Sequence, residues 1–294
     1  MKTMVYLSTV GRPVEPADAK VSVFDRGFLY GDSIYETMRT AGGRAVELAR
    51  HLARLRRSGE GIGLRLPISD EVVENAIDET HRASGNDESY VRIIVTRGEG
   101  PIALDPRAVD SPTFVVIVVP LSLPTAEAYL RGIRAVIVDV EKAGGGLVDP
   151  GIKTGNYLNN ILALRQAIAR GGDDAIMCNA AGEIAEGATS NVFAVLGGEV
   201  VTPHLRAGLL PGITREVVCE LAAAEGRPVA HRTLLPAQLR GADEVFLTSS
   251  VRGIMPVTAL DGATIGTGEA GPITRALQQR YAAYIAEAKR RATA

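Results

Sequence analysis

Two β-branched segments place the strongest constraint on the fold of this chain. The segments SYVRIIVTRG at 89–98 and SPTFVVIVVP at 111–120 are bounded by glycine or proline, which is typical of strands. The second has no polar residue between Thr113 and Pro120, so it is predicted to be buried on both faces. The N-terminal half of the chain is therefore expected to form a sheet with covering helices, an α/β lobe.

The covering helices are predicted by apolar residues at helical spacing. The segment 46–64 places Val46, Leu48, Leu52 and Leu55 on one stripe, which predicts a helix that ends near Gly59. The segment DEVVENAIDETHRASG repeats this pattern. A short strand is also predicted for VSVF, residues 21–24.

A second lobe is predicted after a proline-containing linker. The segment PLSLPTAEAYLRG has two prolines and few core residues, and IRAVIVDVEK then begins a new set of strands. A chain of 294 residues is long enough for two cores. The predicted division is a small N-terminal α/β domain at 1–120, a linker at 121–130 and a larger domain at 131–294. In the larger domain, strands are predicted at 174–179, 191–196 and 244–248, and helices from Tyr157 to about Arg170, from Thr214 to about Glu225 and from Pro272.

Composition excludes several classes of partner and site. The formal charge of −2 offers no basic field for nucleic acid, and there is no run of 18 apolar residues to span a membrane. The opening MKTMVYLSTVGRPVEP lacks the apolar core of a signal peptide, so a cytoplasmic protein is expected. The spacing of the few cysteines and histidines does not match a metal site, so no metal is predicted. These residues are Cys178, Cys219, His51, His81, His204 and His231.

Common catalytic and nucleotide-binding motifs are also missing from the sequence. There is no G-x-S-x-G segment for a hydrolase nucleophile and no G-x-x-x-x-G-K-[ST] segment for a nucleoside triphosphate. The glycine runs GGRAVE and AGGGLVD lack the spacing of a dinucleotide fingerprint. These runs are predicted to be loops.

Three separate features remain and are consistent with one cofactor. Lys153 lies in a glycine-rich turn before a predicted helix, where desolvation and the helix N-terminus would make its amine nucleophilic. Glu186 precedes an apolar strand in EIAEGATSNVF, and GLLPGITREVV begins a helix at Ile213 and Thr214, where free N–H groups attract an anion. Individually these are ordinary features: a surface lysine, a turn carboxylate and a helix cap. Together they provide the amine, the carboxylate and the phosphate site that pyridoxal phosphate needs.

Five motifs, in order along the chain, resemble the class IV aminotransferases. They are FDRGFLYGDSIYET, HLARL, KTGNY, EGATSN and LPGITR, and the resemblance extends from about Tyr6 to Gly262. It implies pyridoxal 5′-phosphate as cofactor and the α/β (α+β type) architecture called fold type IV. This architecture has a small N-terminal α/β domain and a larger domain with a pseudo-barrel of strands flanked by helices. It also implies at least a homodimer, because the family builds each pocket from two chains.

The resemblance assigns roles to the residues in these motifs. Lys153 would form the Schiff base with the cofactor and then carry the proton between the substrate α-carbon and the cofactor. Glu186 would pair with the ring nitrogen, and Tyr157 would bind the ring hydroxyl. The phosphate would be held by one side chain of HLARL, by the start of the helix and by a serine of LTSSV: Arg54, Ile213, Thr214, and Ser249 or Ser250.

Substrate-binding residues are implied by the same resemblance. The segment YGDSIYETMR would line the pocket, where aromatic walls suit an apolar side chain, and YVR matches the pair that branched-chain enzymes use near the substrate carboxylate. Arg252, in TSSVRGIMPV, departs from the Gly-Thr-Ala loop of that group. It either contacts a second carboxylate or points to solvent. The predicted substrate residues are Tyr30, Tyr35, Arg39, Tyr90, Arg92 and Arg252.

The predicted reaction is transfer of an amino group between an aliphatic, branched-chain L-amino acid and 2-oxoglutarate, by a ping-pong route. The turn YET replaces the aromatic-Glu-Gly turn of the branched-chain group. TRGEG lacks the arginine–histidine pair of bacterial D-amino acid enzymes, which counts against that group. The alternatives are a D-amino acid aminotransferase, an (R)-amine transaminase, an aminodeoxychorismate lyase, or a protein that holds the cofactor without turnover.

Overall fold

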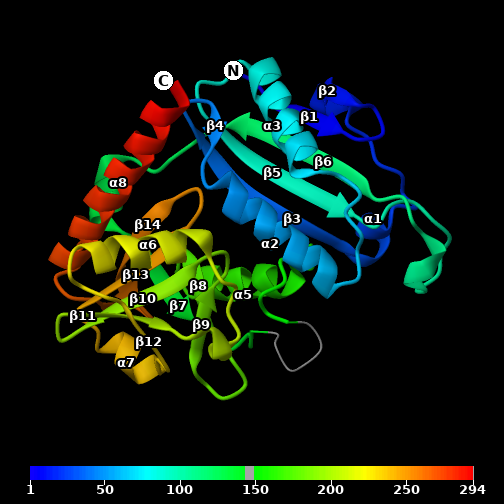
Figure 1. Cartoon of the computed structure of the whole chain (residues 1–294). Coiled ribbons are helices and arrows are strands. Elements are labelled where there is room, and N and C mark those ends of the chain that lie inside the picture. Colours follow the sequence, from blue (N-terminus) through cyan, green and yellow to red (C-terminus); the bar gives the residue numbers. More distant parts are fainter. Residues whose placement is uncertain (143–148, 294) are drawn as a thin grey trace. The chain divides into compact units, whose positions relative to one another are not determined.

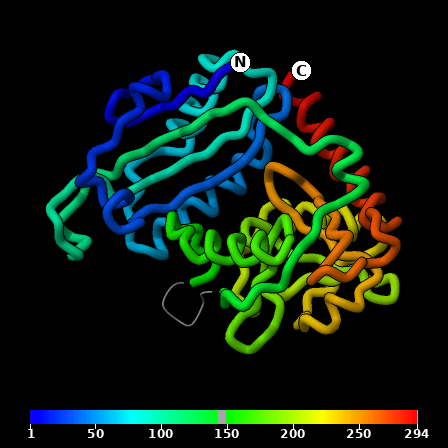
Figure 2. Tube along the Cα trace, turned by 180° about the vertical axis from the view of Figure 1, so that it is seen from behind, coloured from blue at the N-terminus to red at the C-terminus, as the bar shows by residue number. Residues whose placement is uncertain are grey.

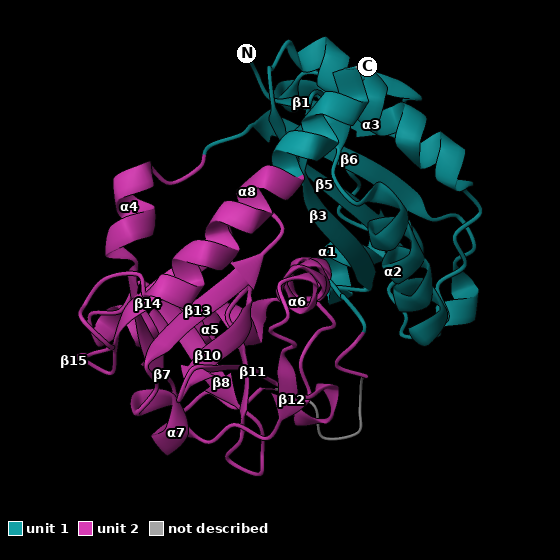
Figure 3. Cartoon of the chain, turned by 60° about the vertical axis from the view of Figure 1, so that its left-hand side comes forward, with its two compact units in different colours: residues 1–122, 152–156, 285–294 teal, residues 123–151, 157–284 magenta. Residues whose placement is uncertain are grey.

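The computed structural model describes residues 1–142 and 149–293. The chain divides into two compact units, shown in different colours in Figure 3. Unit 1 comprises residues 1–122, 152–156 and 285–294, and unit 2 comprises residues 123–151 and 157–284. The short segment 152–156 therefore clusters with unit 1, although both of its flanks belong to unit 2.

Unit 1 is built on a six-stranded sheet with the order β2-β1-β6-β5-β3-β4, and each neighbouring pair is antiparallel. The two β-branched segments form the adjacent strands β5 and β6, as the sequence predicts. Strand β3, which pairs with the other edge of β5, was not predicted as a strand. The strands are β1 (Met4–Leu7), β2 (Arg12–Val14), β3 (Ser33–Ala41), β4 (Arg44–Ala45), β5 (Ser89–Thr96) and β6 (Thr113–Pro120).

Helices α2 and α3 cover one face of this sheet (Figure 1). Alternate residues of β3, Ile34 and Met38, pack against these helices in one apolar core, as the two-residue period of a strand requires. The opposite face of the sheet is nearer the viewer in Figure 2. The helices are α1 (Arg26–Tyr30), α2 (Leu48–Gly61) and α3 (Asp70–Ser84), with single 3-10 turns at η1 (Pro16–Asp18) and η2 (Pro106–Ala108).

The predicted strand at 21–24 is wrong. Residues 23 and 24 form a turn, and the Asp25 side chain accepts a hydrogen bond from the N–H of Gly27, so that α1 begins directly afterwards. Val21, Val23 and Phe24 are exposed. Local capping therefore sets the structure here, although the apolar run satisfies the composition of a strand.

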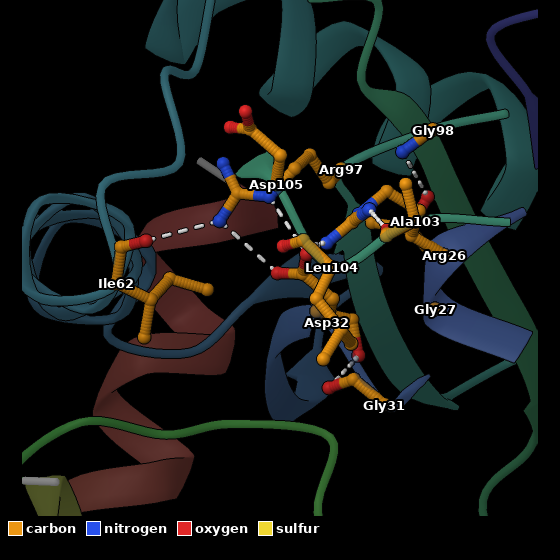
Figure 4. A network of polar contacts seen from close by, with 12 residues as sticks. Arg26, Gly27, Gly31, Asp32, Ile62, Arg97, Gly98, Ala103, Leu104 and Asp105 are labelled. Carbon is orange, nitrogen blue, oxygen red and sulfur yellow. Dashed lines mark hydrogen bonds and ion pairs between the residues drawn. The ribbon is translucent and has the colours of Figure 1, made fainter. Parts of the chain in front are cut away.

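A buried ionic network fixes the start of β3 (Figure 4). Asp32 accepts hydrogen bonds from Arg26 and Arg97, and Arg97 also donates to the carbonyl oxygens of Ile62 and Gly63 after α2. Burial raises the pKa of Asp32, but the hydrogen bonds and charges of the two arginines outweigh it and hold the pKa below its ordinary value. The network joins α1, β3, β5 and the end of α2.

Unit 2 contains a closed ring of six strands. Eight strands of its nine-stranded sheet follow the order β12-β11-β10-β13-β14-β7-β8-β9, and the ninth, β15, pairs with β14. Strand β9 also pairs with β10, which closes the ring. This confirms the predicted pseudo-barrel. The strands are β7 (Ile133–Ile137), β8 (Asp174–Cys178), β9 (Ile184–Gly187), β10 (Asn191–Leu196), β11 (Glu199–Pro203), β12 (Ala230–Arg232), β13 (Glu244–Ser249), β14 (Gly253–Leu260) and β15 (Ala263–Thr264).

Helices cover the outer face of this ring. Helix α5 packs on residues of β7 and β8, whereas α6 and α8 pack on β10, β13 and β14. The segment predicted as a linker, 121–130, contains all of α4 except its last residue. In the described part of the chain, no helix is long and apolar enough to cross a membrane. The helices are α4 (Ala126–Arg131), α5 (Leu158–Ala169), α6 (Ile213–Ala224), α7 (Pro236–Arg240) and α8 (Pro272–Thr293), with a 3-10 turn at η3 (Leu205–Ala207).

Candidate active site

The backbone of Lys153 is held against the open edge of β3. Because β4 pairs only with Thr40 and Ala41, the first residues of β3 have an edge available. The N–H of Tyr35 donates to the carbonyl oxygen of Lys153 at 3.1 Å, and the N–H of Gly155 donates to that of Ser33 at 2.8 Å. The N–H of Lys153 also donates to Ser58 Oγ on α2 at 3.0 Å. Lys153 is therefore positioned by both a strand and a helix of unit 1.

The close approach of this segment depends on Gly155. A Cβ atom at Gly155 would lie 2.1 Å from Ser33 Oγ, far inside van der Waals contact. Steric crowding by Ser33 thus explains why the KTGNY motif has a glycine at this position, and the sequence alone does not reveal it.

The side chain of Lys153 lies over the aromatic ring of Tyr35. Its Nζ is 4.3 Å from the ring centroid, and Cζ of Arg92 is 4.5 Å from the same centroid. Both distances are within the range of cation–π attraction. Tyr35 is buried, so one ring orders both the lysine amine and the guanidinium.

Four of the predicted substrate residues share a face of unit 1. In the β3–β5 register, Thr37 is opposite Arg92 and Arg39 is opposite Tyr90, and opposed residues project to the same side of a sheet. Tyr35, Arg39, Tyr90 and Arg92 therefore lie on the face away from α2 and α3. Tyr30 is not in the sheet: it ends α1, with the Arg26 guanidinium 5.1 Å from its ring centroid.

Arg54 lies on the other face, where it pairs with Glu36. Its Nε and Nη2 donate to the two carboxylate oxygens of Glu36 at 2.7 and 2.8 Å, and His51 Nδ1 is 2.7 Å from Glu36 Oε2. The relative exposures of Glu36, His51 and Arg54 are 0%, 1% and 3%. This is a bidentate ion pair with a third donor, and all three side chains are almost fully buried.

The charges in this cluster follow from its contacts. Burial raises the pKa of Glu36, but the hydrogen bonds and charge of Arg54, with the hydrogen bond from His51, lower it to about 2. Burial lowers the pKa of His51, and the charges of Arg54 and Lys153 add to this effect, against the opposing influence of Glu36. Near neutral pH, Glu36 is therefore ionised, and His51 is neutral with its proton on Nδ1, facing the carboxylate.

In unit 2, Glu186 lies on β9, between the strands covered by α5 and those covered by α6. The N–H of Leu210 donates to its Oε2 at 2.9 Å, and Lys142 Nζ is 2.5 Å from its Oε1. Asn191 is opposite Glu186 in the strand register, and its side-chain amide donates to the carbonyl oxygen of Leu210. The carboxylate is thus buried, oriented and tied to the loop that leads to α6.

The N-terminus of α6 follows this loop directly. Gly212 is its N-cap and provides no side-chain cap, and a Cβ there would lie 1.9 Å from Asn191 Oδ1. Ile213 and Thr214, the first helical residues, are buried. The first N–H groups of such a helix are directed at an incoming anion.

Three hydroxyl groups lie at the end of β13, the strand that pairs with β10. Thr248 is opposite Asn191 in the β10–β13 register, and its buried Oγ1 has no hydrogen-bond partner among the described residues. Ser249 and Ser250 follow it and are half-buried. Tyr157 lies at the N-cap of α5.

Arg252 is tied to the barrel through its side chain and its backbone. Its Nη2 donates to Asp174 Oδ2 at 2.8 Å, and its carbonyl oxygen accepts a hydrogen bond from the Tyr129 hydroxyl at 2.6 Å. Asp174 is buried, so this ion pair is shielded on one side.

Within each unit, the structure therefore assembles part of the predicted site. Unit 1 carries Lys153 together with Tyr35, Arg92 and Arg54, and unit 2 carries the residues predicted for the ring nitrogen and much of the phosphate site. Sequence reasoning did not identify Glu36, His51 or Lys142. A signal for Glu36 existed: in SIYETMRTA it occupies the same alternation as Ile34 and Met38, so it is an acid at a core position.

Comparisons with known proteins agree with this arrangement. The family described as amino-transferase class IV matches residues 33–260. The chain is 37% identical over 277 residues to a putative branched-chain-amino-acid aminotransferase of Methanocaldococcus jannaschii, covering 94% of both chains. It is 30% identical over 268 residues to a D-alanine aminotransferase of Bacillus licheniformis, covering 91% of this chain and 93% of that protein.

A solved structure shows the same architecture with a ligand. A branched-chain amino acid aminotransferase from T.th., in complex with N-(5′-phosphopyridoxyl)-L-glutamate, matches with a TM-score of 0.90 and 27% identity. The match covers 98% of this chain and 95% of that one. The fold, the motif residues and the extent of these matches lead to one assignment: the chain belongs to the class IV aminotransferases and is a pyridoxal-phosphate-dependent enzyme.

Proposed function

We propose that this enzyme transfers the amino group between an aliphatic, branched-chain L-amino acid and 2-oxoglutarate. The observation that carries the proposal is the position of Lys153 Nζ and Arg92 Cζ, 4.3 and 4.5 Å from the Tyr35 ring centroid. An amine that exchanges a proton with the α-carbon of an amino acid has to lie near the group that binds the α-carboxylate. In unit 1, a lysine and an arginine share one aromatic ring.

The residues present fit pyridoxal phosphate. Lys153 is the amine that would bind it, Glu186 would hold its ring nitrogen in the protonated state, and Tyr157 would contact its ring hydroxyl. Its phosphate would be held by Arg54, the first N–H groups of α6, and the hydroxyls of Ser249 or Ser250. The buried Thr248 Oγ1, which has no partner among the described residues, adds a further group able to bind a ligand oxygen or water. When bound, the cofactor accepts the amino group and withdraws electrons from the substrate α-carbon.

The chain's own residues would divide the remaining work. Lys153 Nζ would take the proton from the α-carbon of the amino acid and return it in the reverse half-reaction. Arg92 would bind the α-carboxylate, with Tyr30, Tyr35, Arg39, Tyr90 and Arg252 around the substrate. Aromatic walls of this kind suit an apolar side chain.

The choice of substrates is supported by the relatives. The name of the Methanocaldococcus jannaschii relative refers to branched-chain amino acids, and the matching solved structure contains a phosphopyridoxyl derivative of L-glutamate. The Bacillus licheniformis relative, named for D-alanine, supports a second candidate, a D-amino acid aminotransferase. We also propose that the enzyme is a homodimer or a higher oligomer, because the family builds its pocket from two chains. We propose the cytoplasm as its location.

A comparison of activity with three alternative amino donors tests the proposal. The purified enzyme, loaded with pyridoxal phosphate and 2-oxoglutarate, is given L-leucine, D-alanine or (R)-1-phenylethylamine, and glutamate formation is measured. We expect the highest kcat/KM with L-leucine. A higher value with D-alanine would transfer the assignment to the second candidate. Pyruvate release from aminodeoxychorismate without an amino acceptor would assign the lyase reaction instead.

A further inference from the structure

Glu36 occupies a position where a carboxylate is costly. It lies on β3 between Ile34 and Met38, whose side chains pack in the core under α2 and α3, and it has no exposed surface. Burying an ionised carboxylate is strongly unfavourable unless it is paired and hydrogen-bonded. An apolar residue would fill this position at lower cost, so the carboxylate points to a role other than packing.

The contacts of Glu36 restrict the orientation of one guanidinium. Arg54 uses Nε and Nη2 for the two carboxylate oxygens, which leaves its Nη1 edge turned away from Glu36. His51, one helical turn earlier on α2, donates from Nδ1 to Oε2 and so fixes the carboxylate itself. With three donors on two oxygens, neither Glu36 nor Arg54 can rotate without breaking a buried hydrogen bond.

We propose that Glu36 and His51 are positioning residues that hold Arg54 so that its Nη1 edge is presented to the phosphate of the cofactor. This rests on the proposed function, in which Arg54 binds that phosphate. An arginine that is already oriented loses less rotamer entropy when the anion binds, and the gain appears as affinity. His51 contributes its hydrogen bond without adding a positive charge, because it is neutral near pH 7.

If only charge mattered, removing the Glu36 carboxylate would change phosphate affinity in the opposite direction. Glu36 is negative and the phosphate is negative, so removing the carboxylate charge would strengthen anion binding if orientation were irrelevant. In Glu36→Gln, all three neighbouring donors remain, and the amide group would face at least one of them with a donor of its own. Orientation of Arg54 would then be lost, and phosphate binding would weaken.

The phosphate contribution can be measured separately from the rest of the cofactor. In phosphate-free buffer, the protein is titrated with pyridoxal phosphate and with pyridoxal, which lacks the phosphate, and both dissociation constants are taken from the absorbance change. The preference for pyridoxal phosphate, which is the Kd of pyridoxal divided by that of pyridoxal phosphate, reports the phosphate site alone. We expect Glu36→Gln to lower this ratio by about tenfold or more, and His51→Phe to lower it by about threefold.

Glu88 provides a matched control. It is also a carboxylate of unit 1, and it accepts hydrogen bonds from Thr40, Gly42 and Gly43 rather than from Arg54. Glu88→Gln is expected to leave the ratio unchanged. Glu36→Asp keeps the charge but shortens the side chain, and it is expected to lower the ratio as Glu36→Gln does. If Glu36→Gln does not fold, as judged by circular dichroism, the ratio is measured in Glu36→Asp and His51→Phe instead.

The possible failures are distinguishable. A ratio in Glu36→Gln or Glu36→Asp that equals or exceeds that of wild type would overturn the positioning role. If wild type itself shows no preference for pyridoxal phosphate over pyridoxal, or if Arg54→Gln leaves the ratio intact, the proposed role of Arg54 is wrong. When Arg54 is already replaced by glutamine, adding Glu36→Gln is expected to cause no further decrease, because the two residues act as one unit.

Discussion

The N–H of Tyr35 donates a hydrogen bond to the carbonyl oxygen of Lys153, and the ring of the same tyrosine lies beneath the Lys153 amine. Tyr35 therefore positions Lys153 through both its backbone and its side chain. Arg92, across the β3–β5 pair, contacts the same ring. The geometry of the lysine is thus set by the strand that also carries predicted substrate residues.

Replacing Gly155 by alanine tests this attachment. The new Cβ would meet Ser33 Oγ at 2.1 Å, so either the Ser33 hydroxyl has to leave its position or the segment has to move away from β3 and carry Lys153 with it. We expect kcat to fall by about 100-fold, because small displacements of a reacting group are costly. The measurement is single-turnover kinetics with L-leucine, with circular dichroism as a check on folding.

Ser33→Ala provides the rescue for this variant. With the hydroxyl removed, the nearest remaining atom is Ser33 Cβ at 3.5 Å, an ordinary contact. The double variant is expected to recover most of the lost rate. If Gly155→Ala is fully active, or if the double variant is no better than the single one, the steric account of this glycine is wrong.

The stability of the protein without cofactor is expected to depend on Glu36 at acidic pH. The pKa of Glu36 is lowered from 4.5 to about 2 in the folded protein. A lowered folded-state pKa stabilises the fold above pH 4.5, and that contribution is lost as the pH falls toward about 2. Wild type should exceed Glu36→Gln by roughly 3 kcal/mol in the free energy of unfolding at pH 7, with the difference narrowing below pH 4.5. Urea titrations from about pH 7 to about pH 3 measure it, and a constant difference would contradict the assignment.

Replacing Glu186 by glutamine is expected to lower kcat by about 100-fold or more. An amide keeps the shape of the side chain but cannot hold a protonated ring nitrogen by charge, and preorganised electrostatic groups typically contribute this much. The rate of conversion of L-leucine measures the effect. Glu183→Gln, in the turn before β9, is the control, because Glu183 contacts Asn179 and Thr233 instead. If Glu186→Gln and Glu183→Gln convert L-leucine at equal rates, the proposed role of Glu186 is wrong.

Much of the fold could be predicted from periodicity. The runs that form β5 and β6 and the stripes of α2 and α3 are strong local patterns, and their ends deviate by only a few residues. Strand β3 was missed because SIYETMRTA mixes polar and apolar residues. The error at 21–24 has a different cause: the Asp25 cap on α1 is a local hydrogen bond that composition does not reveal.

The site was predictable only in part, because its geometry depends on contacts between distant residues. The addition of residues 153–155 to the edge of β3 joins Lys153 to Tyr35 and Gly155 to Ser33, far apart in the sequence, and no local pattern encodes it. The pairing of Lys142 with Glu186 is equally non-local. By contrast, Arg54 and His51 follow from HLARL on one helix, and their shared partner Glu36 becomes evident once β3 is recognised as a strand.

The most direct test of the account is the identity of the lysine that binds the cofactor. The chain has five lysines: Lys2, Lys20, Lys142, Lys153 and Lys289. The enzyme is loaded with pyridoxal phosphate, reduced with borohydride, digested and mapped by mass spectrometry. We expect the phosphopyridoxyl group on Lys153, and no label at this position in Lys153→Ala. A label on Lys142, which lies beside Glu186, or on any other lysine in place of Lys153 would contradict it.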